Sequence, residues 1–160
     1  MIGVMADSHD NLVAVRKAVS LFKNVKCELV IHAGDFVAPF AARELKALDC
    51  PVKSVFGNCD GEKIGLEKAI EPFGEINEAP ITFVHAGKNF LACHYHFSVK
   101  SYLSLGKYDI IIFGHTHKLE IRKEGKTLLL NPGETGGWLS GKSTVALLDP
   151  GILEVEIISL

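Results

Sequence analysis

The segment Phe113–Lys118 places two histidines two residues apart, behind a glycine and directly after the apolar run Ile110–Phe113. One histidine at the end of a strand is unremarkable. Two imidazoles on alternate positions can both point into one cavity. Neutral imidazoles are common ligands of divalent transition ions. The segment therefore indicates a metal site and raises the question of where the other ligands lie.

Side chains that can bind metals also follow four other apolar runs. Each run is predicted to be a buried strand, and in α/β sheets ligands bind at the carboxyl ends of strands. A D-x-H pair or a Gly-Asp turn alone is common and usually caps or turns the chain. Their joint occurrence at five strand ends, in a chain with seven histidines, favours a shared site. The candidate ligands are Asp7, His9, Asp35, Asn58, His94, His115 and His117.

These ligand types restrict the metal. Carboxylates, imidazoles and one amide oxygen, with no thiolate required, suit divalent ions of the first transition row. Seven candidate ligands are too many for one ion, but they suit two ions ~3.5–4 Å apart that share a carboxylate. We expect two divalent ions, with Mn²⁺ favoured and Ni²⁺, Co²⁺, Fe²⁺ or Zn²⁺ as alternatives.

The composition predicts one globular domain over residues 1–160. With 48% hydrophobic and 22% charged residues, the chain can bury a sizeable core. The formal net charge is −2, and no block of Lys and Arg stands out. A nucleic-acid surface is therefore not expected, nor is attraction to an anionic membrane.

The four cysteines form no C-x-x-C pair, so we expect free thiols in a reducing cytoplasm. The first residues lack the basic region of a signal peptide. No apolar run approaches the ~18 residues of a membrane span. We therefore expect a cytoplasmic protein without a membrane segment.

The first half of the chain alternates strands and helices. Apolar runs at Ile2–Ala6, Glu28–Ala33 and Val52–Phe56 predict strands. A helix with Asn11 as its N-cap follows the first run, and a second amphipathic helix is predicted over Phe40–Leu48. Strands joined through helices indicate a parallel sheet with helices on at least one face.

The second half is richer in hairpins. A helix is predicted over Ser98–Leu105 and a buried strand over Asp109–Phe113. Together with the first half, this pattern predicts an α/β fold of two stacked mixed β-sheets, a β-sandwich, flanked by helices. Exposed hairpin edges would also allow a homodimer. The hairpins are predicted at Ile81–His85 with Asn89–His94, Leu119–Arg122 with Thr127–Leu130, and Ser143–Asp149 with Ile152–Ile158.

The order D-x-H, G-D, G-N, H-x-H and G-H-x-H, from Asp7 to about Gly133, resembles the calcineurin-like metallophosphoesterases. Among them it is most similar to the small single-domain phosphodiesterases. The resemblance covers most of the chain and implies the helix-flanked β-sandwich. It also implies that Asp7, His9 and His117 hold one ion, that Asn58, His94 and His115 hold the other, and that Asp35 bridges them.

The resemblance implies a two-metal phosphodiesterase that hydrolyses a small phosphodiester, or a related phosphorylated compound, by in-line attack of a hydroxide bridging the ions. The neutral oxygen of Asn58 would limit the anionic charge and keep the ions electrophilic. The alternative is a non-catalytic protein-interaction scaffold, as in the retromer subunit of this fold, whose metal site is altered. All seven ligand positions are metal-competent here, which favours the enzyme. A nuclease is less favoured, because a basic groove is lacking.

The substrate side departs from many relatives, which carry a histidine directly after the G-N asparagine to help the leaving group depart. This chain has Cys59 there, as small phosphodiesterase relatives often do, and a thiol is a poor acid at pH 7. His96 is the alternative acid, although a supporting or surface role fits it equally well. We place Tyr95 and Glu134 on the substrate side, and Trp138 either in the pocket or at a protein contact.

The remaining polar residues are expected to serve structure. His32 lies inside a predicted strand and should have a buried partner. His85 should end a hairpin strand, and Asp10 and Asp60 should act as turn or capping residues.

Overall fold

The computed structural model describes all 160 residues and contains two mixed β-sheets, which confirms the predicted fold class. The strand order is β11-β10-β1-β2-β3-β4 in one sheet and β5-β6-β7-β9-β8 in the other. The strands are β1 (Ile2–Met5), β2 (Leu29–His32), β3 (Val52–Val55), β4 (Gly74–Asn77), β5 (Ile81–His85), β6 (Lys88–Ala92), β7 (Ile110–Ile112), β8 (Leu119–Glu124), β9 (Thr127–Pro132), β10 (Thr144–Asp149) and β11 (Glu154–Ser159).

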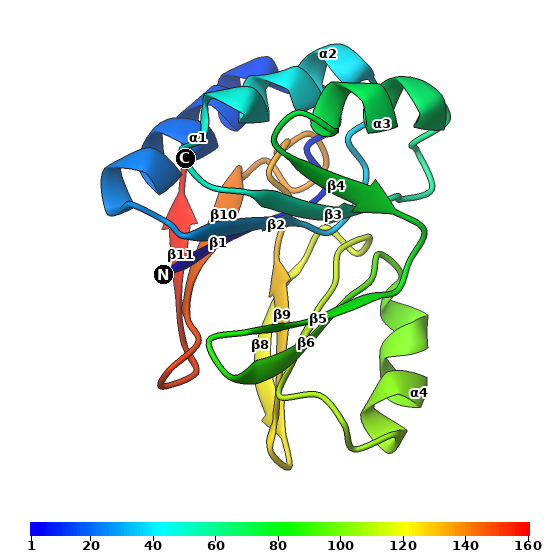
Figure 1. Ribbon diagram of the computed structural model, residues 1–160, viewed down its shortest axis with the longest axis vertical. Coiled ribbons are helices and arrows are strands. Elements are labelled where there is room, and N and C mark those ends of the chain that lie inside the picture. Colours follow the sequence, from blue (N-terminus) through cyan, green and yellow to red (C-terminus); the bar gives the residue numbers. More distant parts are fainter.

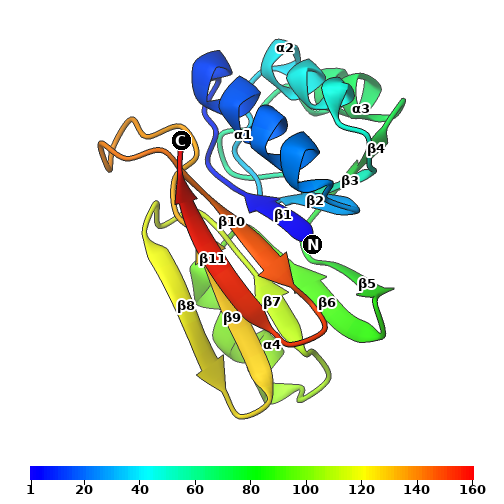
Figure 2. The ribbon, with the colours of Figure 1, turned by 90° about the vertical axis from the view of Figure 1, so that its left-hand side faces the viewer.

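Helices flank both sheets. Figure 1 shows α1, α2 and α3 over the six-stranded sheet and α4 beside the five-stranded sheet at the other end of the molecule. The view in Figure 2 shows α1 to α3 together over β1 to β4. None of the helices combines the length and the apolar composition that crossing a membrane requires. They are α1 (Leu12–Val25), α2 (Pro39–Ala42), α3 (Lys63–Ile70) and α4 (Val99–Ser104), with 3₁₀ segments η1 (Arg43–Ala47) and η2 (His96–Ser98).

Alternate residues of the central strands pack into different layers. Ile31 of β2 lies in the cluster between the sheets, together with Ile110 of β7. Val30, its neighbour, packs instead under α1 and α2. In the second sheet, Ile111 turns outward into a smaller cluster that α4 covers. Burial on both faces explains why these strands appear in the sequence as continuous apolar runs rather than alternating ones.

The parallel strands gather the polar loops. Strands β1 to β4 run parallel, and so do β6, β7 and β9. The carboxyl ends of parallel strands meet at one edge, so the loops after them lie close together. The two edges also adjoin, because Nδ1–H of His94, after β6, donates to the carbonyl oxygen of Ala33, after β2, at 2.8 Å. Loops from both sheets therefore face one another.

The predicted hairpins are confirmed. Strands β5 and β6, β8 and β9, and β10 and β11 pair antiparallel. His85 ends β5 as expected, and the turn residues Ala86 and Gly87 both have positive φ, 48° and 72°. Such a two-residue turn matches the twist of the strands. In the last hairpin, Val155 and Ile157 face the core between the sheets, as their alternation with glutamates predicts.

Two features differ from the sequence predictions. The helix expected over Phe40–Leu48 is a short α-helix that begins at Pro39 and tightens into the 3₁₀ segment η1, a common ending for a helix. Helix α3 and strand β4 were not predicted. Gly65 interrupts the apolar pattern of α3, and β4 has four residues, of which only Ile76 is buried.

Candidate metal centre

The predicted ligands of the first ion converge in the structure. One ligand atom from each of Asp7, His9, Asp35 and His117 lies within 4.8 Å of the others. Nε2 of His9 is 3.6 Å from Oδ2 of Asp35, and Nε2 of His117 is 3.7 Å from Oδ1 of Asp7. These separations exceed hydrogen-bond length and match two ligands of a shared cation. The loops after β1, β2 and β7 supply this group.

The other three predicted ligands meet at the amide of Asn58. Its Oδ1 lies 2.9 Å from Nε2 of His94 and 2.8 Å from Nδ1 of His115. Nε2 of His94 also lies 3.5 Å from Oδ2 of Asp35. Asp35 therefore stands between the two groups of side chains, at the position that a bridging carboxylate would occupy.

In the second group, formed by Asn58, His94 and His115, hydrogen bonds to other residues leave acceptor atoms facing one another. Nδ1–H of His94 donates to the Ala33 carbonyl, so in a neutral ring Nε2 is an acceptor. Nδ2–H of Asn58 donates to Sγ of Cys59 at 3.2 Å, which turns its acceptor Oδ1 toward the histidines. Acceptors this close need a proton or a cation between them. The arrangement therefore fits a divalent ion.

The pKa values agree with this picture. Burial lowers the pKa of His94, but contact with Asp35 outweighs it and the net pKa is raised. The Asp35 carboxylate therefore favours positive charge beside Nε2 of His94, as expected of a site for a cation. Burial lowers the pKa of His9 and of His115, so both rings tend to be neutral and able to bind a metal. Nε2 of His9 is buried without a hydrogen-bond partner, which also fits a metal ligand.

The two carboxylates differ in charge. Burial raises the pKa of Asp7 to about 7, even though His94 and His117 pull it down. Burial also raises the pKa of Asp35, but the His94 contact and the backbone N–H of Cys59 bring it to about 2. Asp35 is therefore ionised at neutral pH, whereas Asp7 is poised to lose a proton when a cation binds.

The ligand loops are held in uncommon backbone conformations. Five of the seven predicted ligands have positive φ, between 40° and 70°. Non-glycine residues seldom adopt this region, and such strain gathers at functional sites where the surrounding structure enforces it. The ligand loops therefore adopt less stable backbone conformations that direct the ligand side chains toward one another. The five are Asp7, His9, Asp35, His115 and His117.

Asp60 holds the Asp35 loop in place. Its side chain is buried, Oδ2 accepts from the backbone N–H of Asp35 at 3.0 Å and of Gly57 at 2.7 Å, and Oδ1 accepts from that of Val37 at 2.8 Å. A Cβ at Gly57 would lie 2.1 Å from Oδ1 of Asp35, so only glycine allows this approach. Asp60 was expected to be a turn or capping residue. It joins two ligand loops, a role that no local sequence signal marks.

Two other residues support the loops as expected. His32 is fully buried, and its Nε2 lies 3.0 Å from Oγ of Ser8, between the two ligands of the D-x-H segment. Its Nδ1 accepts from the Gly34 backbone, so Nε2 carries the proton and donates to Ser8. Burial lowers the pKa of His32 to about 3, which keeps the ring neutral. Asp10 lies in a turn, as expected, and its Oδ1 accepts from the Ala38 backbone N–H at 3.0 Å, which links the loops after β1 and β2.

Glu134 is 1% exposed and lies beside the first group of ligands. Its oxygens accept from the backbone N–H groups of Trp138, Leu139 and Ser140 at 2.8–3.1 Å. Burial raises its pKa, but these N–H groups outweigh it and bring the pKa to about 2. Oε1 also lies 3.1 Å from Nδ1 of His117, although the two atoms are not aligned for a hydrogen bond. Glu134 thus shapes the pocket through a loop and a ligand.

A hollow of about 400 Å³ lies over the candidate ligands. Cys59 is exposed at its edge, beside Asn58. Tyr95 and His96 flank His115 outside the lining: the His96 ring stacks on that of His115 at 5.7 Å, and the Tyr95 ring lies 5.0 Å away. The lining residues are His9, Asp35, Asn58, Cys59, His115, His117, Glu134, Trp138 and Leu139.

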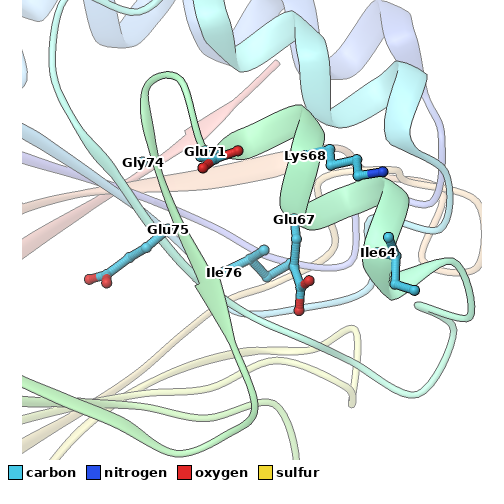
Figure 3. Close-up of a pocket in the computed structure, with 7 residues that line it drawn as sticks. All are labelled: Ile64, Glu67, Lys68, Glu71, Gly74, Glu75 and Ile76. Atoms are coloured by element: carbon cyan, nitrogen blue, oxygen red, sulfur yellow. The ribbon is translucent and has the colours of Figure 1, made fainter.

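A second hollow, of about 350 Å³, lies between α3 and β4, away from the ligand loops. Figure 3 shows its side chains, with Glu67 beside Ile76. Three glutamates and one lysine line it, so it would repel an anionic ligand.

Comparison with known proteins agrees with the geometry. The calcineurin-like phosphoesterase superfamily domain matches residues 1–151. A phosphodiesterase of Methanocaldococcus jannaschii is 36% identical over 152 residues, which cover 92% of each chain. A solved archaeal phosphodiesterase superposes with a TM-score of 0.95 at 35% identity, covering 99% of both chains. Vps29 of Entamoeba histolytica, solved with Zn²⁺, has a TM-score of 0.68 at 19% identity over 99% of this chain and 98% of that one, and shares the fold alone.

Asp7→Asn should change how the metal-free protein responds to pH. The folded pKa of Asp7, about 7, lies above the ordinary 3.8. Asp7 therefore contributes its full stabilisation below pH 3.8, and this contribution is lost as the pH rises toward 7. The loss in unfolding free energy is about 1.4 kcal/mol per unit of pKa difference. Asn cannot ionise, so the variant should gain stability relative to wild type between about pH 4 and 7. Urea unfolding of metal-free protein across this range measures the difference. Asp49→Asn, an exposed control, should leave the slope unchanged, and equal slopes in wild type and Asp7→Asn would contradict the assignment.

Asp60→Asn should loosen the Asp35 loop. The amide replaces one acceptor oxygen with a donor that faces backbone N–H groups, so we expect a loss of about 1–3 kcal/mol in unfolding free energy. Metal affinity should fall by ~10–100-fold, as for other groups that position ligands. Urea unfolding and metal titration measure the two effects. Glu71→Gln, the same change at an exposed site, is the control, and matching values for both variants would exclude this role for Asp60.

Proposed function

Because this chain belongs to the calcineurin-like phosphoesterase superfamily and is a metallophosphoesterase, we propose that it is a phosphodiesterase acting on a small phosphodiester with two divalent ions. The observation that carries the proposal is the position of Asp35, between two groups of metal-competent side chains. The proposed ligand sets are Asp7, His9 and His117 for one ion and Asn58, His94 and His115 for the other, with Asp35 shared.

The residues present fit this chemistry. When bound, two such ions supply a hydroxide nucleophile near neutral pH and offset charge on the phosphoryl oxygens. The protein contributes fixed geometry: Ala33 sets the proton of His94, and Cys59 turns the amide of Asn58. The strained loops keep the ligands aimed into the hollow, so little reorganisation is needed when a substrate arrives. Mn²⁺ is the ion we favour for this oxygen and nitrogen donor set.

A proton for the leaving group must come from the substrate side. His96 is exposed and stacks on His115 at the edge of the site, outside the lining of the hollow, so it is the alternative candidate and an inefficient acid there. Burial and the carboxylate of Asp35 raise the pKa of the Cys59 thiol to about 11. A group with so high a pKa transfers protons poorly at neutral pH. We therefore propose that the enzyme prefers diesters with good leaving groups.

The alternative function, a protein-interaction scaffold, is less supported. Vps29 of Entamoeba histolytica is only 19% identical to this chain and shares only the fold. The phosphodiesterase of Methanocaldococcus jannaschii is 36% identical over most of the chain. All seven candidate ligand positions also carry metal-competent side chains.

Asp35→Ala should be the most damaging single ligand change. Wild type reconstituted with Mn²⁺ should hold about two ions per chain. Losing the shared carboxylate should weaken both ions and reduce kcat/KM on bis(p-nitrophenyl) phosphate by more than the ~10–100-fold typical of a supporting residue. Asp7→Ala should affect mainly one ion. Metal analysis and kinetics on folded protein measure this, and a fully active Asp35→Ala would show that Asp35 is not the bridge.

Cys59→His should help poor leaving groups. The imidazole titrates near ~6.5, and general acid help is typically ~10²–10⁴-fold. The gain should be small for p-nitrophenolate, which departs without full protonation. The slope of log rate against leaving-group pKa should be shallower in the variant than in wild type. Equal slopes would mean either that another residue already supplies the proton or that the new imidazole does not reach the leaving oxygen. His96→Ala in the wild-type background separates these cases, because a steeper slope there identifies His96 as the acid.

A further inference from the structure

The hollow over the ligands has one apolar wall, formed by Trp138 and Leu139. These side chains are 64% and 79% exposed, yet they line the same hollow as Asp35 and Asn58. Scattered exposed apolar residues are ordinary, but two adjacent ones in the wall of a polar cleft mark a binding surface. The wall therefore faces the part of a substrate that extends beyond the phosphate.

The wall is held firmly despite its exposure. The buried carboxylate of Glu134 accepts the backbone N–H groups of Trp138 at 2.8 Å and of Leu139 at 3.1 Å. The indole Nε1–H of Trp138 donates to the carbonyl oxygen of His9 at 3.0 Å. One candidate metal ligand, His9, thus fixes the edge of the indole, and another, His117, contacts the carboxylate that fixes its backbone.

A ring fixed in this way suits stacking. Its polar N–H is already satisfied, so a ligand can cover the ring without stranding a donor. Its conformation is already restricted, so less entropy is lost on binding. Stacking of a base on an aromatic side chain commonly strengthens binding by roughly 5- to 150-fold. A flat aromatic group is therefore the ligand chemistry that gains most from this wall.

We propose that Trp138 selects the organic group of the substrate, and that this group is an aromatic ring, either a nucleobase or a simple aryl group, carried on the phosphodiester. This inference rests on the proposed phosphodiesterase function and names its substrate class. Trp138 was expected either in the pocket or at a protein contact, and its place beside the ligands favours the pocket.

The first experiment compares diesters that share one leaving group. The substrates are the p-nitrophenyl esters of thymidine 5′-phosphate, phenyl phosphate and methyl phosphate. The preference for each aromatic ester over the methyl ester, measured as kcat/KM, should fall by roughly 5- to 150-fold in Trp138→Ala. The loss should lie mainly in KM, and Trp138→Phe should recover most of it. Ile64→Ala, which removes a similarly exposed side chain from the second hollow, is the matched control.

The two aromatic esters separate the sources of the ring. A preference for the thymidine ester alone assigns a nucleobase, whereas a preference shared with the phenyl ester assigns any aryl group. An unchanged preference in Trp138→Ala, with methyl and aromatic esters both hydrolysed, overturns the inference and leaves the proposed function standing.

The second experiment needs no turnover. Trp138 is the only tryptophan in the chain, so its fluorescence reports on this wall directly. In protein loaded with Zn²⁺, adenosine 5′-monophosphate should quench the emission in a saturable way, and ribose 5-phosphate should not. If no ester is hydrolysed, the proposed function fails, and this measurement still decides whether Trp138 binds an aromatic ring. Equal quenching by adenosine 5′-monophosphate and ribose 5-phosphate would overturn the inference. Quenching that depends on protein concentration and not on ligand concentration would overturn it as well.

Discussion

The carboxylate of Asp35 is buried where the loops of the two sheets meet and is nevertheless ionised, and the rest of the site is arranged around this charge. A buried anion is costly unless partners surround it. Here the partners are the backbone N–H of Cys59 at 2.8 Å and the imidazoles of His94 and His9 at 3.5 and 3.6 Å. They come from three different loops. The charge can therefore be accommodated only when the carboxyl ends of both sheets have come together, which links folding of the sandwich to assembly of the site.

The loops that meet this requirement carry unfavourable backbone conformations, and buried groups outside the ligand set hold them. Asp60 takes three backbone N–H groups, and the neutral ring of His32 supports Ser8. Neither residue reaches the hollow. They orient the ligand loops from the packed interior, so the directions of the ligands do not depend on surface segments.

The strands, the hairpins and the clustering of the polar loops could be predicted from the sequence, because each has a local residue pattern that the fold preserves. The apolar runs and hairpin turns predicted the sandwich, because each strand carries its own burial pattern. The convergence of the candidate ligands could be predicted because parallel strands bring their carboxyl ends together at one edge. Helix α3 and strand β4 were missed, since four residues with one buried side chain leave little pattern. The backbone hydrogen bonds of Asp60 and Glu134 were not predicted, because a carboxylate that accepts from loop N–H groups follows no regular spacing in the sequence.

The unequal charges of Asp7 and Asp35 suggest how a binuclear site of this kind would fill. Both carboxylates are buried, yet their pKa values are about 7 and about 2, because burial outweighs the nearby imidazoles and the His115 N–H at Asp7, whereas the contact with His94 and the Cys59 N–H outweigh burial at Asp35. A first cation that uses Asp35 meets a charge already present. A cation that uses Asp7 must also displace a proton, so its affinity should rise with pH. Proton release is then concentrated at the ligand set of Asp7, His9 and His117, the side on which Glu134 contacts His117. The carboxylate of Glu134 adds negative charge beside His117. This charge would attract a cation bound by His117 and so offset part of the free energy needed to displace the proton of Asp7.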